Sequence, residues 1–120
     1  MSQHPIVHVD FATSDPKATG RFLADLFGWQ VETNEAFHYV MWQPQNGPGG
    51  GLVTVDNQGF RPGEALVYVG TDDIDDTLAR ARDLGATVVE PKHEVTGFGW
   101  WAVLTDAAGA RVALYQALPR

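Results

Sequence analysis

The sequence predicts an α+β fold built from two β-α-β-β-β modules, in which curved mixed sheets form a cup and the helices lie outside. The prediction rests first on Val67–Gly85, where a β-branched strand leads into acidic cap residues, an amphipathic helix and a glycine stop. It rests secondly on the recurrence of this order, because Asp15–Gly28 and Asp72–Gly85 span cap-to-stop intervals of equal length. Such a repeat indicates a duplicated supersecondary unit.

The first module is predicted to open with the strand Ile6–Ala12, which alternates between an apolar and a polar face. The apolar face consists of Val7, Val9 and Phe11. We expect this face to pack on the helix that follows. His8 and Asp10 are then left on the opposite face of the sheet.

The helix of the first module is predicted to have Asp15 or Ser14 as its cap and Pro16 at its first position, and to end at Gly28. Its apolar stripe is expected to consist of Ala18, Phe22, Leu23, Leu26 and Phe27. The strands after it are expected at Trp29–Thr33, Phe37–Gln43 and Gly51–Val55.

The second module repeats this order after the turn-rich connection Asp56–Gly63. Asp72 is the predicted helix cap, and Gly85 is the predicted stop. The apolar stripe consists of Ile74, Leu78 and Ala81. The strands that follow are expected at Ala86–Glu90, Trp100–Thr105 and Arg111–Gln116. One domain, 1–120, thus contains a first module of about 5–56 and a second of about 64–118.

The composition of the 120 residues excludes several classes of protein. There is no cysteine, so disulfides, iron–sulfur clusters and thiol nucleophiles are excluded. The net charge of −7 argues against a nucleic-acid partner, since such proteins usually carry a basic face. The sequence has no apolar run long enough to span a membrane and no signal peptide at its start, so we expect a cytoplasmic protein without a membrane partner.

Two groups of residues resemble a known family. The first group is His8-Val9-Asp10-Phe11, Asp15-Pro16 and Leu26-Phe27-Gly28-Trp29, and the second is Asp72-Asp73-Ile74-Asp75, Leu84-Gly85-Ala86, Phe98-Gly99 and Thr105-Asp106. Together they are similar to the two modules of glyoxalase/bleomycin-resistance proteins, the vicinal oxygen chelate superfamily, over nearly the whole chain. Ala107 stands where the turn of the family usually has proline. The resemblance implies a cup that holds a small organic molecule, often in a homodimer.

The resemblance also implies where a metal would be held. Metal-dependent members place four ligands in the cup, one near the start of each module and one on each final strand. Here these positions fall on His8, near Gly51, on Leu66 and on Ala113. Only His8 can ligate, whereas a catalytic divalent metal needs about three protein ligands. We therefore expect no metal and no other cofactor. A site with relocated ligands is the alternative, with His8, His38, Glu64 and His93 as its candidates.

His8 and Asp10 are the candidate catalytic residues, because they share one strand face. Their Cα atoms are expected roughly 7 Å apart, a separation that allows direct pairing but does not favour it. As a ligand-binding pair they also suit a polar anchor, since imidazole titrates near working pH. The alternative is a histidine that is satisfied by a neighbouring backbone group or by water.

Aromatic side chains are the other candidate ligand-binding residues. Tyr68 lies on the strand that corresponds to that of His8, and Gly70 leaves room beside its ring. Trp101 is expected to face the cup, and its neighbour Trp100 the other way. The remaining candidates are His38, Trp42 and Tyr115. Ordinary sheet or core packing is the alternative for each of them.

Two glycine-containing segments are expected to carry no chemistry. Lys92–Gly99, which includes His93 and Glu94, is predicted to be a solvated loop near the mouth of the cup. Asn46–Gly51 is followed by strand-like residues rather than by a helix, so a phosphate-binding loop is excluded.

These observations predict a protein that binds a small organic ligand, aromatic or polycyclic, without a metal. Sequestration of the ligand, as in bleomycin-resistance-type relatives, would need no catalytic residue. The alternative is a lyase, isomerase or oxygenase of the same fold, either cofactor-free with His8 and Asp10 as acid–base groups or metal-dependent through relocated ligands. An accessory module that serves only association is a further alternative.

Overall fold

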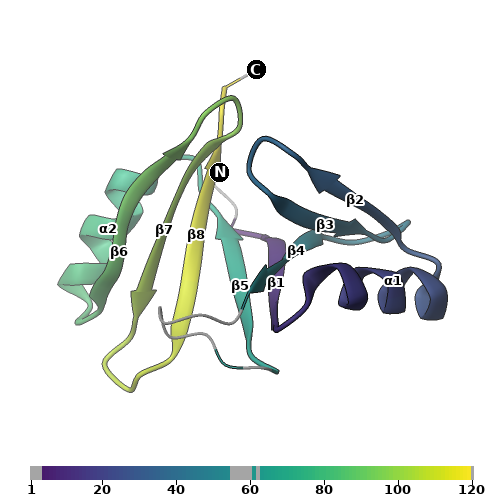
Figure 1. Ribbon diagram of the computed structural model, residues 1–120. Coiled ribbons are helices and arrows are strands. Elements are labelled where there is room, and N and C mark those ends of the chain that lie inside the picture. Colours follow the sequence, from purple (N-terminus) through teal and green to yellow (C-terminus); the bar gives the residue numbers. More distant parts are fainter. Residues whose placement is uncertain (1–3, 55–60, 62, 120) are drawn as a thin grey trace. The chain divides into compact units, whose positions relative to one another are not determined.

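The computed structural model describes residues 4–54, 61 and 63–119, and it confirms the α+β fold with two β-α-β-β-β modules (Figure 1). The first module consists of β1 (Ile6–Thr13), α1 (Pro16–Phe27), β2 (Gln30–Asn34), β3 (Tyr39–Gln43) and β4 (Gly49–Thr54). The second consists of β5 (Ala65–Gly70), α2 (Ile74–Asp83), β6 (Thr87–Val95), β7 (Gly99–Thr105) and β8 (Arg111–Ala117). The cup concerns how the modules are placed relative to one another and stays a prediction. Most of the predicted connection Asp56–Gly63 lies outside the described residues.

The chain divides into two compact units close to the module boundary. His8–Leu66 form one unit, and the residues from Val67 onward form the other together with the segment before His8. Within this second unit, Gly70 N–H donates to the carbonyl of Pro5 at 2.8 Å. The strand β1 therefore begins in one unit and continues in the other.

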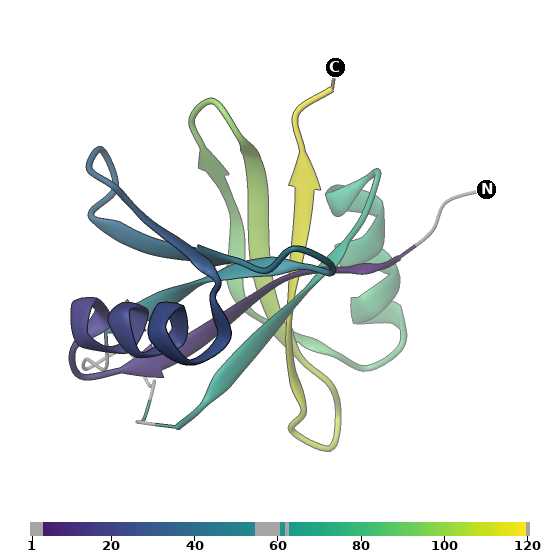
Figure 2. The ribbon, with the colours of Figure 1, turned by 90° about the vertical axis from the view of Figure 1, so that its right-hand side faces the viewer.

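In the first module the strands follow the order β2-β3-β4-β1. Neighbouring strands are antiparallel except β1 and β4, which are parallel. The helix α1 lies on one face of this sheet (Figures 1 and 2). The core on that face consists of Leu23, Val40, Trp42 and Leu52, with Val9, Phe11, Trp29 and Val31 packed against it. Burial of one such side chain stabilises the fold by about 1.5–3 kcal/mol, so the core holds the apolar face of β1 toward α1.

In the second module the strands follow the equivalent order β5-β8-β7-β6, with β5 parallel to β8 and the other pairs antiparallel. The helix α2 covers one face (Figure 1). The core consists of Ile74, Leu78, Ala102 and Leu114, with Val69, Val88, Trp100 and Leu104 packed against it. Each module thus keeps one sheet face for its helix and leaves the other face helix-free.

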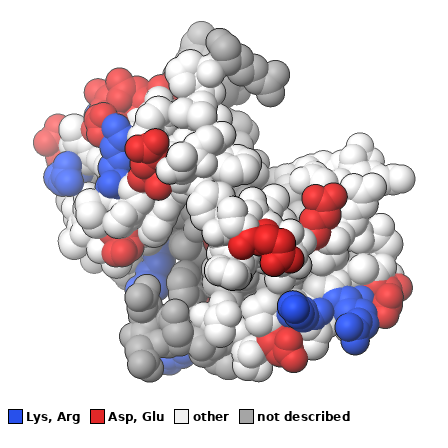
Figure 3. Space-filling view, turned by 45° about the horizontal axis from the view of Figure 1, so that its top comes forward, with Lys and Arg blue, Asp and Glu red and all other residues white. Residues whose placement is uncertain are grey.

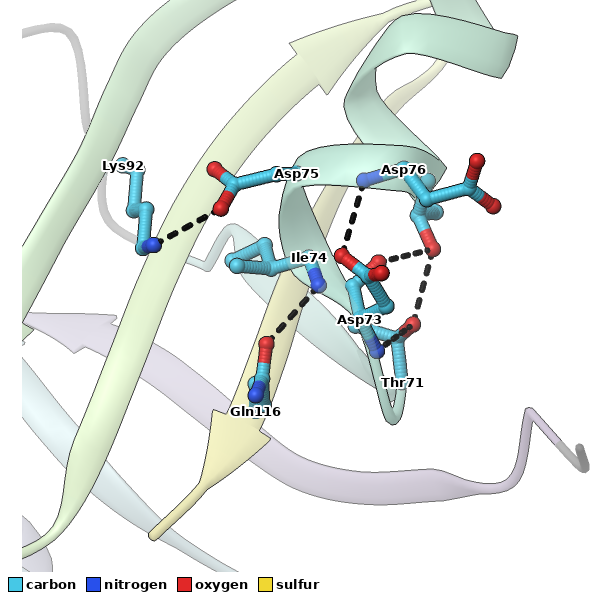
Figure 4. Close-up of polar contacts among 8 residues, drawn as sticks. Thr71, Asp73, Ile74, Asp75, Asp76, Lys92 and Gln116 are labelled. Atoms are coloured by element: carbon cyan, nitrogen blue, oxygen red, sulfur yellow. Dashed lines mark hydrogen bonds and ion pairs between the residues drawn. The ribbon is translucent and has the colours of Figure 1, made fainter.

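The second helix begins one residue later than predicted. Asp73, not Asp72, is the N-cap, because its side chain accepts from a first-turn N–H at 3.0 Å (Figure 4). The N–H of Asp73 in turn donates to the hydroxyl of Thr71 at 3.2 Å. Gln116 of β8 accepts from the N–H of Ile74 at 2.8 Å, which satisfies another free donor of the first turn. The buried side chain of Ile74 anchors the helix start in the core at this register.

The first helix begins in the same way, so the repeat extends to single hydrogen bonds. Asp15 accepts from a first-turn N–H at 3.1 Å, and its own N–H donates to Thr13 at 3.1 Å. In both modules the corresponding threonine hydroxyl lies 2.7 Å from that of a first-turn threonine, which is Thr19 in α1. Gly28 ends α1 as predicted, with φ of 74° in the left-handed region.

The apolar stripe predicted for α1 was too wide. Gly20 and Leu23 are the residues that α1 buries. Phe22, Leu26 and Phe27 are exposed. The helix lies close to the sheet at Gly20, where an added Cβ would come within 3.0 Å of a valine methyl of β2. This close approach turns the side of α1 that carries Phe22 and Leu26 away from the sheet.

The strand β6 is longer than predicted, so the expected loop Lys92–Gly99 is wrong. The strand continues to Val95, and His93 pairs with Trp101 of β7. The register shifts on either side of Glu90, which places the following proline, a residue without an N–H, at an irregularity of the ladder. The glycines of the segment, which were the reason to expect a loop, lie after the end of β6, and the irregularity accommodates the proline.

Within the part of the chain that the structure describes, no helix is long and apolar enough to cross a membrane. On the face drawn in Figure 3, the basic side chains form small groups next to acidic ones. This face therefore offers no broad basic surface of the kind that a phosphate backbone needs.

Candidate functional site

A hydrogen-bonded cluster of His8, Asp10 and Tyr39 lies on the helix-free face of the first module. The Nε2 atom of His8 lies 3.0 Å from Oδ1 of Asp10 and 2.7 Å from the hydroxyl oxygen of Tyr39. The hydroxyl of Tyr39 donates to the same carboxylate oxygen. Asp10 is 3% exposed, whereas the side chain of His8 is 28% exposed. The carboxylate is therefore covered, and the imidazole is the more accessible group.

Alternation along β1 places His8 and Asp10 on the face that the sequence predicted, and the two side chains pair directly, which their spacing did not favour. Val9 and Phe11 pack against the α1 core, so His8 and Asp10 point to the opposite face. The apolar side chains of β1 pack against α1, so the polar side chains that alternate with them lie together on the other face.

Gly51 creates the space for the ring of Tyr39. It lies opposite Asp10 in the parallel pairing of β1 and β4. A Cβ atom at Gly51 would occupy the same space as the ring and hydroxyl of Tyr39. A phenol from β3 therefore fills the final-strand position at which the resemblance implied a metal ligand.

The chemistry of the three groups assigns the protons of the cluster. A carboxylate only accepts, so Asp10 accepts from the hydroxyl of Tyr39 and from Nε2–H of His8. In the neutral imidazole, Nδ1 is then the acceptor nitrogen. This arrangement can hold a polar group of a ligand, and it can accept a proton at Nδ1.

The donor set does not fit a divalent metal ion. Of the four positions that the resemblance implied, three have no side-chain atom that can bind a metal ion. These are Gly51, Leu66 and Ala113. Among the described residues, no three His, Cys, Asp or Glu side chains come close enough to hold an ion. The candidates for a relocated site form no such group among the described residues either.

Aromatic rings lie on the helix-free face of the second module. Trp101 of β7 lies opposite Tyr115 of β8 and His93 of β6, so the three form a row across neighbouring strands. The rings of His93 and Trp101 stack with centroids 4.7 Å apart and planes inclined by 25°. Tyr68 of β5 lies on the same face, opposite Ala113. This face presents planar surface of the kind that flat organic molecules stack on.

Trp100 packs against the α2 core, so alternation places its neighbour Trp101 on the helix-free face. Tyr115, which shares the face of Trp101, donates its hydroxyl to the carbonyl of Phe98 at 3.0 Å. Burial raises the pKa of Tyr115 above its usual value near 10, because the phenolate loses hydration there. The group is therefore a neutral phenol at physiological pH.

Trp42, a predicted ligand-binding residue, lies on the opposite face of the sheet from the cluster. It is 5% exposed in the α1 core, where its ring stacks on those of Phe11 and Trp29. Its Nε1–H donates to the carbonyl of Gly51 at 3.1 Å, so its polar atom is already satisfied. The ring faces the helix because Trp42 has the same alternation as the buried Val40.

His38 also lies away from the cluster. It is exposed in the turn between β2 and β3, with φ of 52° in the left-handed region. Asn34 forms this turn, because its side chain accepts from the N–H groups of Ala36 and Phe37 at 3.0 and 3.3 Å. The strand therefore begins at Tyr39 rather than at the predicted Phe37.

Tyr39 is the site residue that sequence reasoning missed. Two features of the sequence could have identified it: a tyrosine on the predicted third strand, and a glycine, Gly51, near the metal-ligand position of the next strand. Alternation places Tyr39 on the face opposite Val40 and Trp42. With β3 starting at Tyr39, that face is the face of His8.

Comparisons with known proteins agree with this arrangement of modules. A family model described as a glyoxalase-like domain matches residues 7–115. Two curated relatives named "Putative glyoxylase CFP32", from Mycobacterium bovis and Mycobacterium tuberculosis, are each 28% identical over 126 residues. These alignments cover 91% of this chain and 44% of the relative. The chain thus spans less than half the length of the curated relatives it matches.

Solved structures share the fold at low identity. A methylmalonyl-CoA epimerase from Mycobacterium tuberculosis is 19% identical with a TM-score of 0.74, covering 95% of this chain and 88% of that one. A Streptomyces coelicolor methylmalonyl-CoA epimerase in complex with 2-nitronate-propionyl-CoA is 20% identical with a TM-score of 0.67, covering 95% and 97%. A glyoxalase/bleomycin resistance protein/dioxygenase superfamily member from Vibrio splendidus is 14% identical with a TM-score of 0.65, covering 95% and 99%.

Proposed function

The chain belongs to the glyoxalase-like domain family within the vicinal oxygen chelate superfamily, and from this premise we propose that it binds a small organic molecule without a protein-held metal ion. The His8 cluster of the first module offers contacts for a polar group. Taken by itself, the ring face of the second module offers a stacking surface for a flat apolar group. Retention of the ligand without turnover, as in sequestration, requires no further group.

The observation that carries this proposal is the phenol of Tyr39 in the space that Gly51 leaves open. The phenol bonds to Asp10 and lies 2.7 Å from Nε2 of His8, so these donors bind one another. A cation at this position would have to displace the phenol and break these bonds. An organic hydroxyl or another donor group can instead donate to Nδ1 from the accessible side of His8.

The preference for an aromatic ligand is supported by the second module. Trp101 and His93 are already stacked, and Tyr115 continues the row. A row of rings across adjacent strands offers contact along roughly 10 Å, since neighbouring strands lie about 4.8 Å apart. Such a surface suits two or three fused rings better than a compact aliphatic molecule.

A ligand screen tests this proposal. Thermal shift is measured for chelator-treated protein with planar aromatic acids, polycyclic antibiotics and acyl-CoA thioesters, and hits are titrated by calorimetry. We expect at least one class to bind, and we expect His8→Ala to weaken binding of the hit at least 10-fold, or about 1.4 kcal/mol. His38→Ala is the matched control, because this histidine is exposed in a turn. A well-folded sample without any hit would contradict the proposal.

A second candidate function is proton transfer without a metal. It is favoured by the cluster itself, in which Asp10 and Tyr39 hold the imidazole of His8 with Nδ1 as the acceptor. Nδ1 would remove a proton from carbon next to a thioester carbonyl, the electron pair would move into the carbonyl to form an enolate, and the proton would return to the same carbon. The structural similarity to two epimerases supports testing a thioester.

Deuterium exchange separates the two candidates. Methylmalonyl-CoA in deuterated buffer is followed by NMR for loss of the proton next to the carbonyl. If the chain is an enzyme of this type, the wild type exchanges the proton, and His8→Ala abolishes exchange while affinity falls little. If exchange is absent but a ligand binds, His8 is an anchor and the protein is a binder.

A further inference from the structure

An acidic side chain lies beside the row of rings on the second module. The ring row consists of His93, Trp101 and Tyr115, which lie side by side on β6, β7 and β8. Glu90 of β6 pairs with Val103 of β7, two residues along that strand from Trp101. Ala102, which lies between those two residues, belongs to the α2 core. Alternation therefore places Glu90 and the ring row on the same helix-free face.

The carboxylate of Glu90 is close enough to the ring row to affect a charge that binds there. Its Oε1 atom lies 3.8 Å from Nε2 of His93, whose ring stacks on that of Trp101. The side chains of Glu90 and His93 are 44% and 45% exposed, so a ligand can reach both. Two residues along a strand span about 7 Å, which is less than the screening length of about 8 Å at physiological salt. A charged group on the ring row would therefore interact with this carboxylate.

The basic side chains of this sheet, as far as the structure describes it, lie away from the carboxylate. Lys92 of β6 donates to Asp75 of α2 at 3.0 Å, and its Nζ lies 5.3 Å from the ring centroid of Trp100 on the face that α2 covers. Arg111 lies four residues from Tyr115 along β8, which is about 13 Å and beyond the screening length. The end of the ring row on β6 therefore has a negative potential, in a protein whose net charge is −7.

We propose that the flat ligand of the second module carries a positive charge, and that the carboxylate of Glu90 selects it over neutral and anionic molecules of the same shape. The inference rests on the proposed function, since it concerns the molecule that stacks on the ring row. A planar cation, such as an N-alkylated heteroaromatic ring, has both features that this face complements. Its flat surface contacts the rings, and its charge lies near the carboxylate. An anion would bring two like charges together.

The exposure of Glu90 sets the size of the preference. Solvent screens charges at a half-exposed site, so we expect a planar cation to bind about fivefold more tightly than its neutral counterpart, and not several hundredfold. The preference should also fall as salt is added, because the screening length shortens to about 3 Å at 1 M. Stacking of a neutral ring should depend little on salt.

Three bicyclic probes of similar size test the proposal. These are the cation 1-methylquinolinium, neutral quinoline and the anion 1-naphthoate. Each is titrated into the whole chain at pH 8.5, above the range in which imidazole usually titrates, and binding is followed by the NMR signals of the tryptophan indole N–H groups. The variant Trp101→Phe identifies the signal of Trp101. We expect this signal to shift with the cation at the lowest concentration and with the anion at the highest.

Removal of the charge tests the role of Glu90 directly. Glu90→Gln keeps the shape of the side chain, so the affinity for the cation should fall about fivefold, to that of quinoline, while the affinity for quinoline stays unchanged. Glu94→Gln is the matched control, because Glu94 lies on the same strand but pairs with Trp100, on the face that α2 covers. This control changes the net charge equally and should keep the preference. Amide NMR spectra show whether both variants are folded.

The outcomes separate this inference from the proposed function. Equal binding of 1-methylquinolinium and quinoline, or an equal loss of preference in Glu90→Gln and Glu94→Gln, would overturn the selection by Glu90 and leave the stacking surface standing. Failure of all three probes up to roughly 10 mM would contradict the stacking surface itself, and this inference with it. A preference that is lost in Glu90→Gln and kept in the control would support the inference.

Discussion

At the scale of single residues, the absence of a side chain at Gly51 shapes the candidate site. The residue is a glycine because the ring of Tyr39 fills the space beside it, and the phenol there links to Asp10 and His8. The site therefore depends on the missing side chain of Gly51 on β4, which leaves room for the ring of Tyr39 from β3.

Substitution of Gly51 tests whether the ring of Tyr39 needs the space beside this residue. Gly51→Ala places a methyl group where the ring now lies, so we expect a loss of about 1–3 kcal/mol in the free energy of unfolding. Urea denaturation measures the loss. Tyr39→Ala removes the ring, and the double variant should therefore lose less than the sum of the two single variants. Additive losses would show that the two side chains do not share this space.

Tyr115 makes a pH-dependent contribution to stability. Burial raises the pKa of its phenol in the folded protein, so the folded state holds this proton more tightly than the unfolded state does. The resulting stability is present below the usual phenol pKa near 10 and is lost as pH rises toward the folded pKa. We expect Tyr115→Phe to flatten the fall in stability above about pH 10. Denaturation at neutral and alkaline pH measures this, and an unchanged alkaline fall would contradict it.

The face of each β1 residue could be predicted from the sequence, but the partners of His8 could not. Alternation of apolar and polar residues decided that His8 and Asp10 lie opposite Val9 and Phe11. The role of Tyr39 depended on the start of β3, which the side chain of Asn34 sets through the turn before it. The predicted strand began at Phe37, two residues before the observed start, and the sequence analysis therefore named His38 as a site residue and not Tyr39.

At the scale of secondary structure elements, the two helix starts show how closely the modules repeat. Each N-cap aspartate is held by a threonine two residues earlier, and that threonine bonds to another in the first turn. Aligning the modules on Asp15 and Asp73 also pairs His8 with Leu66, as the resemblance implied.

The N-cap of α2 can be assigned by mutation. Asp73→Ala removes the acceptor of a first-turn N–H and should lower the free energy of unfolding by about 1 kcal/mol. Asp72→Ala is the matched control and should have a smaller effect, because its neighbour is the cap. Thermal or urea denaturation compares the two variants. An equal or larger loss for Asp72→Ala would contradict the assignment.

Elements with a strong local signal were predicted well, and those set by packing were not. The glycine stop and the acidic cap of α1 are local, and both were confirmed. The stripe of α1 depended on how close the helix approaches the sheet at Gly20, which no periodicity reveals. The length of β6 depended on pairing with β7 across an irregularity.

At the scale of the whole molecule, duplication explains why the chain has two helix-free faces with different chemistry. The first carries the polar His8 cluster, and the second carries the row of His93, Trp101 and Tyr115. Positions that are equivalent in the two modules hold Asp10 beside Gly51 and Tyr68 beside Ala113. Both modules thus have a small residue on the final strand, Gly51 or Ala113, but only the first module has a carboxylate, Asp10, opposite it.

The measurement that tests the central claim most directly is a calorimetric titration of the ligand with and without chelator. The protein, purified without chelator, is titrated as it is, after EDTA treatment, and after EDTA treatment followed by added zinc or manganese. Because Tyr39 fills the position of a metal ligand, we predict the same Kd within about twofold in all three samples. Binding that disappears with EDTA and returns with the metal would contradict the account.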